Sequence, residues 1–214
     1  KNYGTIVISN EQTNGYGKSN REFLSNKDIG IYMSILINPN CLIEESLKIT
    51  ILTSVAVLSA IKSVCNLDVK LKWVNDIILN DLKVGGILCE SQINLNNNII
   101  DNMIVGIGIN VKEFDFPPSL KNIATSIENN TNIKISRNEL ISEIINFFDL
   151  YFIDNKNYLN LYKENSYVLG KDITVIQNDR QFFAKAIDIE DNGALIVQEQ
   201  EKIIKLISSD ISIR

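Results

Sequence analysis

Apolar residues recur at three- and four-residue spacing over one long segment, residues 44–64. Leu47, Ile51, Val55 and Leu58 fall on one side of a helix, and further apolar residues make its other sides apolar too. This pattern predicts a long helix that is mostly buried against a sheet. Two shorter helical patterns follow, which we expect to cover a face of the same sheet: residues 137–151 and 157–165.

Runs of β-branched residues bounded by turn residues predict strands in the first part of the chain. These runs are residues 5–9, 30–37, 69–73, 77–79, 86–93 and 99–109. Turn signals at Asn80-Asp81 and Asn96-Asn97-Asn98 leave short connections. Short connections favour antiparallel or mixed pairing of the strands that they join.

After Gly170 the pattern changes to closely spaced short strands with polar turns. The strands are expected near residues 173–177, 182–187, 194–198 and 203–207, with turns at Asn178-Asp179 and Asp191-Asn192-Gly193. Such a run indicates a small β-barrel appended to a larger domain. We therefore predict an α+β fold: a mixed, mostly antiparallel sheet with covering helices over residues 1–166, and a barrel over residues 167–214.

The chain of 214 residues contains no histidine, and this absence narrows its chemistry. It excludes serine–histidine and cysteine–histidine catalysis and histidine-bound zinc, so catalysis would have to use lysine, carboxylates or bound ions. A net charge of −5 argues against a surface that follows nucleic-acid phosphates.

Cysteine usage and hydropathy indicate the compartment. Three cysteines without a CxxC spacing speak against a disulfide framework or a thiolate metal site, and favour a reducing environment. No run approaches the roughly 20 apolar residues of a spanning helix, and residues 1–4 show no signal-peptide pattern. We therefore expect a cytoplasmic protein without a membrane or nucleic-acid partner.

The loop that follows the first strand combines glycines with cations. Gly15, Gly17, Lys18 and Arg21 would let backbone N–H groups and positive charges converge on a phosphate. The loop matches neither a P-loop nor a GxGxxG motif, and a surface loop with scattered charge explains it equally well. Phe23, just beyond the loop, would pack either on a purine ring or in the core.

Two further segments place glycines beside polar residues. After a polar Lys-Trp-Val-Asn-Asp turn, Lys83 is followed closely by Gly85 and Gly86. Glycines inside a strand mark a bulge or a close backbone approach to a ligand, although a simple strand start after a hairpin would also produce them. Gly106 and Gly108 leave one face of a later apolar strand without side chains. We expect these segments and the loop to share one pocket.

At these residues the chain resembles the biotin protein ligases, enzymes that attach biotin to a lysine of an acceptor protein. The loop is similar to that family's glycine- and arginine-rich loop, and residues 72–76 resemble its Lys-Trp-Pro-Asn-Asp motif. Residues 83–90 and 106–110 are similar to its next two strands, and Ala124-Thr125-Ser126-Ile127 also matches. The resemblance continues in order from Gln12 to the C-terminus.

The resemblance implies a class II synthetase-like catalytic domain and an SH3-like C-terminal barrel. In the implied reaction, ATP with Mg²⁺ activates biotin to biotinyl-5′-AMP, and a lysine of a biotin carboxyl carrier domain then takes the biotin. The implied catalytic residues are Lys83, Asp76 and Lys18. Contacts to biotin or nucleotide are implied for Gln12, Gly15, Tyr16, Gly17, Lys18, Arg21, Phe23, Asn75, Lys83, Gly85, Gly86, Gly108 and Asn110.

Individual roles follow from the same resemblance. Lys83 would bridge the biotin carboxylate and the α-phosphate, and Asp76 would orient Mg²⁺ or the incoming lysine. Gln12 would contact the biotin ring, Phe23 would stack on adenine, and Asn110 would reach the adenine edge. This chemistry suits a chain without histidine, because the attacking carboxylate is already ionised and needs only alignment and charge shielding.

The sequence departs from the family pattern within these motifs. Tyr16 and Lys18 stand where the loop has arginines, and Val74 replaces the proline. Because lysine cannot reproduce the two-pronged donor geometry of arginine, we expect weaker retention of the adenylate. The family's upstream Ser-Thr-Asn segment, which binds the ureido group of biotin, has no counterpart in this sequence, and neither does its optional DNA-binding domain.

Two other functions stay open at this point. A non-catalytic biotin- or adenylate-binding module would accommodate the altered loop, and a lipoate–protein ligase would share the broad fold. The expected macromolecular partner of a biotin ligase is a carrier domain of a carboxylase, and a homodimer is compatible with the sequence.

Overall fold

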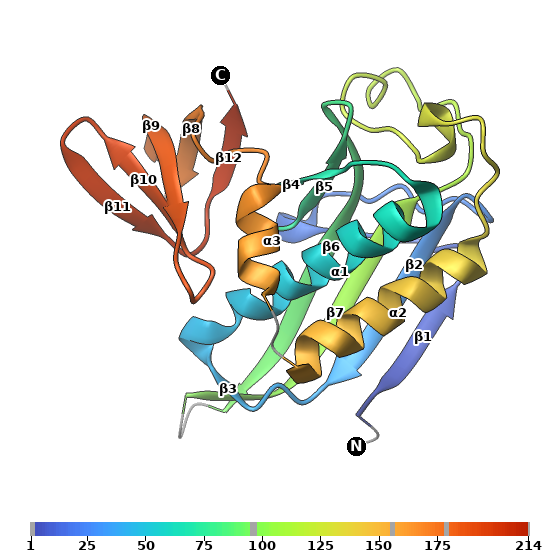
Figure 1. Cartoon of the computed structure of the whole chain (residues 1–214), viewed down its shortest axis with the longest axis horizontal. Helices are drawn as coiled ribbons and strands as arrows, with labels where there is room; N and C mark the ends of the chain where they lie inside the picture. The colour runs from blue at the N-terminus through green and yellow to red at the C-terminus, as the bar shows by residue number, and fades with distance from the viewer. Residues whose placement is uncertain (1–2, 95–97, 155–156, 178–179, 214) are drawn as a thin grey trace.

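The computed structural model describes all residues except 1–2, 95–97, 155–156, 178–179 and 214. Its largest element is a seven-stranded sheet in the order β1-β2-β7-β6-β5-β4, with β3 also paired to β7 (Figure 1). All the named strand pairs in this sheet are antiparallel. The strands are β1 (Thr5–Ser9), β2 (Gly30–Ile37), β3 (Cys41–Leu42), β4 (Lys70–Lys72), β5 (Asp76–Leu79), β6 (Leu82–Asn94) and β7 (Ile99–Asn110).

Helices cover one face of this sheet. Helix α1 (Leu47–Cys65) packs against α2 (Arg137–Asp154) and the short α3 (Tyr158–Glu164), as Figure 1 shows. Most residues of α1 are buried, and the helix ends at Asn66, whose left-handed φ of 50° provides the cap. The predicted buried helix is therefore confirmed. Single 3₁₀ turns are η1 (Lys18–Asn20), η2 (Ile43–Glu45) and η3 (Glu128–Asn130).

One expectation about hydropathy was wrong. Within the described residues, the segment Ile43–Cys65 is long and apolar enough to cross a membrane by length and composition. Most of it is buried inside the protein, because the sheet lies on one side of α1 and the other two helices lie against it. The apolar character of this segment is accounted for by its place in the core.

The C-terminal residues form a separate five-stranded antiparallel sheet in the order β11-β10-β9-β8-β12. Its interior is apolar, with Val175, Ala186, Leu195 and Val197 fully buried. This small β domain corresponds to the predicted barrel. Its strands are β8 (Asp172–Gln177), β9 (Arg180–Ile189), β10 (Leu195–Glu199), β11 (Lys202–Leu206) and β12 (Asp210–Ile213).

The predicted α+β class and most predicted elements are confirmed, with differences at a few ends. Strand β6 begins four residues earlier than expected, and the short strands β3 and β12 were not predicted. The turn at Asn80-Asp81 has φ values of 50° and 64°, as two-residue hairpin turns require. The predicted turns at residues 178–179 and 96–97 lie outside the described residues.

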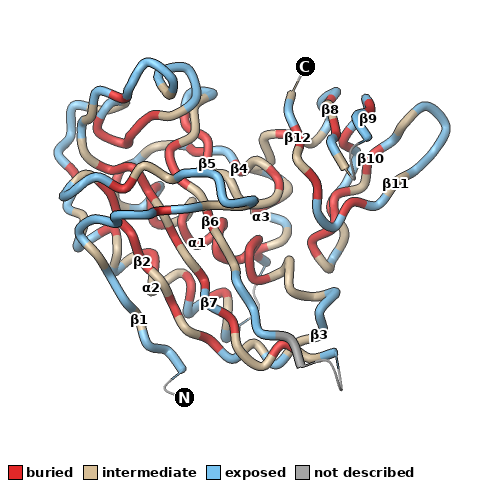
Figure 2. The backbone as a smooth tube through the Cα atoms, turned by 180° about the vertical axis from the view of Figure 1, so that it is seen from behind, coloured by how far each residue is buried: buried red, intermediate tan, exposed pale blue. Residues whose placement is uncertain are grey.

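Burial is highest along the central strands of the large sheet. Seen from behind, red buried positions follow β2 and recur along β7, whereas the edge strand β1 is mostly exposed (Figure 2). The helices cover only one face of these strands, so the other face is available for a site.

Candidate functional site

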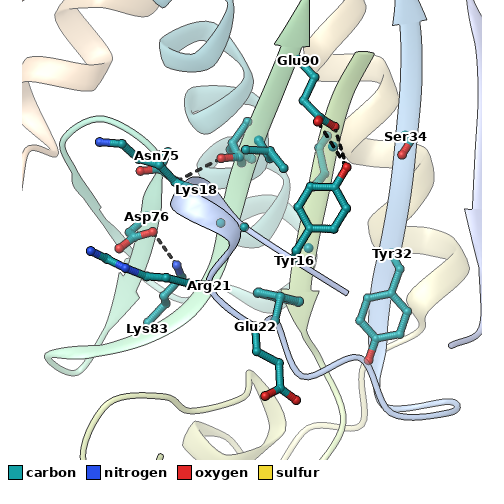
Figure 3. A pocket seen from close by; sticks show the side chains of 18 of the residues that line it. Tyr16, Lys18, Arg21, Glu22, Tyr32, Ser34, Asn75, Asp76, Lys83 and Glu90 are labelled. Carbon is teal, nitrogen blue, oxygen red and sulfur yellow. Dashed lines mark hydrogen bonds and ion pairs between the residues drawn. The ribbon is translucent and has the colours of Figure 1, made fainter. Parts of the chain in front are cut away.

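A cavity of about 390 Å³ lies on the sheet face that the helices leave open (Figure 3). This volume lies within the usual range for a small-molecule site, roughly 300–1,000 Å³. Strands β2, β6 and β7, the loop after β1, the turn after β4 and residues 209–211 of the C-terminal domain all contribute to its lining. The segments that the sequence expected to share one pocket do meet there.

The floor of the cavity consists of adjacent rows of residues that cross the strands. Register places Ser9, Tyr32, Gly108, Gly86 and Asp76 in one row, and Val7, Ser34, Gly106 and Leu88 in the next. Because side chains alternate between faces along a strand, every member of these rows points to the same face. Three glycines in the middle of the two rows leave the sheet open to a ligand.

A bulge in β6 turns Lys83 into this cavity. Gly86 lies opposite Asp76, but Lys83 lies opposite Ile78, so the intervening Val84 is an extra residue in the ladder. In a regular strand, residues 83 and 86 would point to opposite faces, and the bulge brings them to the same face. A Cβ at Gly86 would lie 3.3 Å from Nζ of Lys83, so glycine leaves room for the amine.

The ammonium group of Lys83 is paired but accessible. Its Nζ donates to Oδ1 of Asp76 at 2.5 Å, and the two side chains are 32% and 25% exposed. The main chain of Lys83 is held on both sides, since its N–H donates to the carbonyl of Ile123 at 2.8 Å and its carbonyl accepts from the N–H of Thr125 at 2.9 Å. The segment at residues 123–125 therefore fixes the position of the lysine.

The glycine-containing loop folds as a short hairpin beside the cavity. The N–H of Phe23 donates to the carbonyl of Gly15 at 2.9 Å, and the N–H of Gly17 donates to the carbonyl of Arg21 at 2.8 Å. The 3₁₀ turn η1 forms its tip. These backbone bonds set the directions of the side chains that the loop carries.

Two cations of this hairpin contact the C-terminal domain. Nζ of Lys18 donates to the carbonyl of Ser209 at 2.8 Å and lies 3.5 Å from Oδ1 of Asp210. The guanidinium of Arg21 pairs with Oδ2 of the same carboxylate. Because Asp210 begins β12, the strand that was not predicted supplies a carboxylate to the cavity.

Tyr16 of the hairpin contacts strand β6. Its phenol donates to the carboxylate of Glu90, with 3.2 Å to each oxygen (Figure 3). This hydrogen bond and the negative charge of Glu90 raise the pKa of Tyr16, so the phenol keeps its proton at neutral pH. The pair joins two segments that are 74 residues apart.

Hydrogen bonds connect the motif at residues 72–76 to the C-terminal domain and to strand β6. Nε1 of the buried Trp73 donates to the carbonyl of Gly193 at 2.9 Å, which joins the turn after β4 to the C-terminal domain. Nδ2 of Asn75 donates to the carbonyl of Ile87 at 3.1 Å, and the N–H of Ile87 donates back to the carbonyl of Asn75 at 2.8 Å. The peptide bond between Trp73 and Val74 is cis.

Three residues of the implied contact set do not line the cavity. A Cβ at Gly15 would lie 2.5 Å from the carbonyl oxygen of Phe23, and one at Gly85 would lie 2.6 Å from a carbonyl oxygen of β7. The buried Asn110 donates its side-chain amide to the carbonyl of Thr125 at 3.1 Å. The structure shows close packing at the two glycines and an anchoring hydrogen bond at Asn110, and the implied ligand contacts of the three residues stay predictions.

The remaining members of the implied set do line the cavity: Gln12, Tyr16, Gly17, Lys18, Arg21, Phe23, Asn75, Asp76, Lys83, Gly86 and Gly108. Phe23 faces the cavity and packs on the sheet, since a Cβ at Gly108 would lie 2.8 Å from its ring. The ring therefore occupies part of the space that this glycine leaves. Nε2 of Gln12 donates to Oγ of Ser25 at 3.2 Å.

Several lining residues are not among those that the sequence implied: Tyr32, Ser34, Lys72, Glu90, Ser209 and Asp210. Ser34 could have been found, because it lies directly opposite Gly106 on the neighbouring strand. Lys72 lies opposite Asp76 and adds a cation near Lys83. For Asp210 no local signal existed, because its partners in the loop lie 189 or more residues away.

Comparison with known proteins identifies a family for both parts of the chain. The first half of the chain, residues 1–110, matches the model of the biotin/lipoate A/B protein ligase family. The chain belongs to this family. Residues 168–214 match the model of the biotin protein ligase C-terminal domain, in agreement with the position of the small β domain.

Curated relatives in this family include ligases from bacteria and plants. The bifunctional ligase/repressor BirA of Bacillus spizizenii is 33% identical over 98% of this chain. Biotin–protein ligase 2 of Arabidopsis thaliana is 30% identical over 69% of this chain and 46% of its own length. The chain spans 66% of the length of the Bacillus protein.

Solved structures show the same family fold. The biotin protein ligase from Aquifex aeolicus in complex with biotin and ATP superposes with a TM-score of 0.86 at 23% identity, over 100% of this chain and 91% of that one. The ligase from Leishmania major in complex with biotinyl-5-AMP has a TM-score of 0.63, also at 23% identity, over 95% and 88% of the two chains. The expected biotin ligase-like fold with a C-terminal β domain is confirmed.

Proposed function

We propose that this chain carries the catalytic domain of a biotin–protein ligase. It would activate biotin with ATP to biotinyl-5′-AMP and transfer biotin to a lysine of a biotin carboxyl carrier domain. The observation that carries the proposal is the ammonium of Lys83, which a bulge places beside Asp76 over a glycine floor. Relatives that are named biotin–protein ligases support the choice of substrate.

In the first step, an oxygen of the biotin carboxylate attacks the α-phosphorus of ATP. The bond from that phosphorus to the bridging oxygen breaks, and pyrophosphate leaves with the electron pair. Both reactants are anions, so the step needs positive charge between them. Lys83 would supply it at the reacting atoms, and Lys18, Arg21 and Lys72, which also line the cavity, would shield the phosphates.

In the second step, the amine of the acceptor lysine attacks the acyl carbon of the adenylate. The bond between that carbon and the phosphate oxygen breaks, AMP leaves, and the amine must lose a proton. The carboxylate of Asp76, which pairs with Lys83, would orient the amine and accept its proton.

Adenine would lie against Phe23, which faces the cavity from the end of the loop. Gln12 would contact the biotin ring. Gly17 would approach the adenylate by its backbone, because the side of the hairpin at this position carries no side chain.

Magnesium would enter with the nucleotide. Among the described residues, no three histidine, cysteine or acidic side chains gather into a metal site. The part-exposed carboxylate of Asp76 in the cavity is an oxygen donor of the kind that Mg²⁺ takes in nucleotide sites. Asp76 would supply the carboxylate, and the ion would neutralise phosphate charge.

The surroundings of the site support further parts of the proposal. We place the boundary between the catalytic domain and the barrel at residues 166 and 167, because α3 ends at Glu164 and β8 begins at Asp172. A cytoplasmic location agrees with cysteines that are all free in the described part of the chain. The partner would be a carrier domain that presents a lysine, and the chain could act as a monomer or a homodimer.

The decisive experiment measures pyrophosphate release and biotin transfer with biotin, Mg·ATP and an acceptor domain. Lys83→Ala should lower both rates by about a thousandfold, because a charge at the reacting atoms is removed. Lys70→Ala, which removes an exposed lysine from the adjacent strand β4, is the matched control. Unchanged pyrophosphate release in Lys83→Ala would contradict the proposed role.

Two outcomes would favour the alternatives. Tight biotin binding without pyrophosphate release in the unmodified protein would indicate a non-catalytic binding module. Faster activation of lipoate than of biotin would indicate a lipoate ligase.

A further inference from the structure

The hydrogen bond between Tyr16 and Glu90 lies at the end of the cavity that the proposed chemistry does not use. Glu90 follows Gly86 by four residues along β6, which corresponds to roughly 13 Å of extended strand. Figure 3 shows Tyr16 reaching from the loop toward Glu90, with Ser34 and Tyr32 on the side away from Asp76. The contact therefore bridges the loop and the sheet at a distance from Lys83.

The two ends of the cavity differ in charge. Lysines, Arg21 and carboxylates surround the end at Lys83, whereas the floor next to Glu90 consists of Ser34, Gly106 and Leu88. An acid with an extended, uncharged body fits this division. Its carboxylate would lie at Lys83 and its body would lie on the glycine and serine floor, under the loop.

Side chains of the loop bond to two parts of the protein, the C-terminal domain and strand β6. Lys18 and Arg21 join it to Ser209 and Asp210 of the C-terminal domain. Among the described residues, the side-chain hydrogen bond that joins the loop to β6 comes from Tyr16. Loss of the phenol would free the loop over the floor of Ser34, Gly106 and Leu88 and leave the cationic contacts in place.

We infer that Tyr16 and Glu90 form a latch that closes the loop over the uncharged body of the acid substrate and slows release of the acid and its adenylate. The inference rests on the proposed function and adds a retention device to it. Tyr16 acts through Glu90 as a positioning residue. The phenol is protonated at neutral pH and the carboxylate accepts, so the bond is available under ordinary conditions.

The test combines a double-mutant cycle with two kinetic readouts. Tyr16→Phe, Glu90→Ala and their combination remove the bond from either side or from both. Glu90→Gln keeps an oxygen that can accept from the phenol. Tyr3→Phe is the matched control, because Tyr3 also donates an exposed phenol to a side chain, Oδ1 of Asn102 at 2.9 Å, outside the cavity lining.

The first readout is dissociation of biotin and of biotinyl-5′-AMP, followed by fluorescence of Trp73, which is the one tryptophan of the chain and lines the cavity. Tyr16→Phe and Glu90→Ala should each speed dissociation by about three- to tenfold, the usual worth of a hydrogen bond to a charged group at a partly exposed site. The double variant should be no faster than the single variants, since both remove one interaction. Glu90→Gln and Tyr3→Phe should stay within about twofold of the unmodified protein.

The second readout separates the two substrates. The KM for biotin should rise in Tyr16→Phe by a similar factor, whereas the KM for ATP should change by less than about twofold, because the cationic contacts remain. A merely structural role of Tyr16 would change both values together.

Unchanged dissociation in Tyr16→Phe, or additive effects in the double variant, would overturn the latch. Binding of biotin without turnover in the unmodified protein would contradict the proposed function alone, because biotin dissociation still tests the latch. Absence of biotin binding in the unmodified protein would overturn both.

Discussion

The two faces of the large sheet are made from alternate residues of the same strands, yet they differ in nearly every physical respect. Toward the helices, β2, β6 and β7 present Ile31, Ile87, Val105 and Ile109, which are no more than 2% exposed. Toward the cavity, the neighbouring positions are mainly glycine, serine, tyrosine and glutamate, with Leu88 and Ile104 as the large apolar exceptions. The helix-side face is filled with apolar side chains, whereas the cavity-side face leaves room for a ligand.

Along each of these strands, one residue therefore contributes to the stability of the core and the next one contributes to the ligand-binding surface. On the helix face, side-chain volume fills the core, so its loss leaves a cavity. On the open face, the absence of side chains is what a ligand needs, so added volume is harmful. The bulge at Val84 is the one place in β6 near the cavity where this alternation is shifted, and the shift brings Lys83 to the open face.

The largest expected effect is on the packed face. Ile109 is fully buried, and Ile109→Ala should lower the free energy of unfolding by about 3 kcal/mol, because the core cannot refill the lost volume. Ile104→Ala on the same strand is the comparison, since Ile104 is 46% exposed and should cost less than about 1 kcal/mol. Urea unfolding measures the free energy of unfolding of both variants. Equal losses would show that the two faces do not differ in their contribution to stability.

A similar contrast separates two carboxylates. Asp76 in the site keeps a quarter of its side chain exposed, whereas the side chain of Glu128, in the segment after β7, is 3% exposed. Burial alone would raise the pKa of Glu128, but hydrogen bonds from the N–H of Ile135, from Lys112 and from further donors outweigh it and lower the pKa to about 2. Glu128 is therefore a structural carboxylate.

Because the folded pKa of Glu128 is lowered, its stabilisation is present above the unfolded value, roughly 4.5, and is lost as pH falls toward 2. We expect Glu128→Gln to lower the free energy of unfolding by about 2 kcal/mol at neutral pH, with the difference shrinking below about pH 4. Glu113→Gln, in an exposed ion pair with Lys134, should change little. A difference for Glu128→Gln that does not depend on pH would show that the charge is unimportant.

Much of the fold could be predicted because burial leaves a periodic pattern in the sequence. Helix α1 follows from apolar residues at three- and four-residue spacing, and strands β1 and β2 follow from runs of β-branched residues bounded by turn residues. Strand β12 was missed because it is short and pairs with β8, more than 30 residues earlier. A pairing of that kind leaves no local turn signal.

The parts of the site that belong to local motifs could be predicted. The parts that depend on contacts between residues far apart in the sequence could not. The glycine pair next to Lys83 indicated a bulge, and the structure has one there. The contact of Lys18 and Arg21 with Asp210 joins the two ends of the chain, so no spacing could reveal it. Asn110 shows a different case: a motif position implies a ligand contact, which stays a prediction, and the structure adds a hydrogen bond from its amide to the carbonyl of Thr125.

The next largest effect is expected on the cavity-side face of the sheet, at Gly108. Gly108→Ala would place a Cβ 2.8 Å from the ring of Phe23, so the ring has to shift into the cavity. We expect the KM for ATP or biotin to rise about tenfold, while the free energy of unfolding changes by less than about 1 kcal/mol, because a side chain can move where the backbone cannot. Substrate titrations and urea unfolding on one preparation test this. A large loss of stability with unchanged KM would place Gly108 in the scaffold.

The smallest effect concerns the loop above that face. Lys18 donates to the carbonyl of Ser209 and lies 3.5 Å from a carboxylate oxygen of Asp210, so its single ammonium reaches one good acceptor and one distant one. Lys18→Arg would offer a planar fork that can bond two oxygens at once, whether of the carboxylate or of a phosphate. Release of biotinyl-5′-AMP should slow by about threefold.

Lys62→Arg is the control, because Lys62 forms an exposed pair with Asp68 at the end of α1. An unchanged release rate in Lys18→Arg would contradict weaker retention by lysine. The same variant also probes the division between the faces, since a residue of the open face should alter ligand release without altering unfolding. A rise in unfolding free energy at Lys18→Arg with no change in release would mean that the loop serves mainly to hold the C-terminal domain.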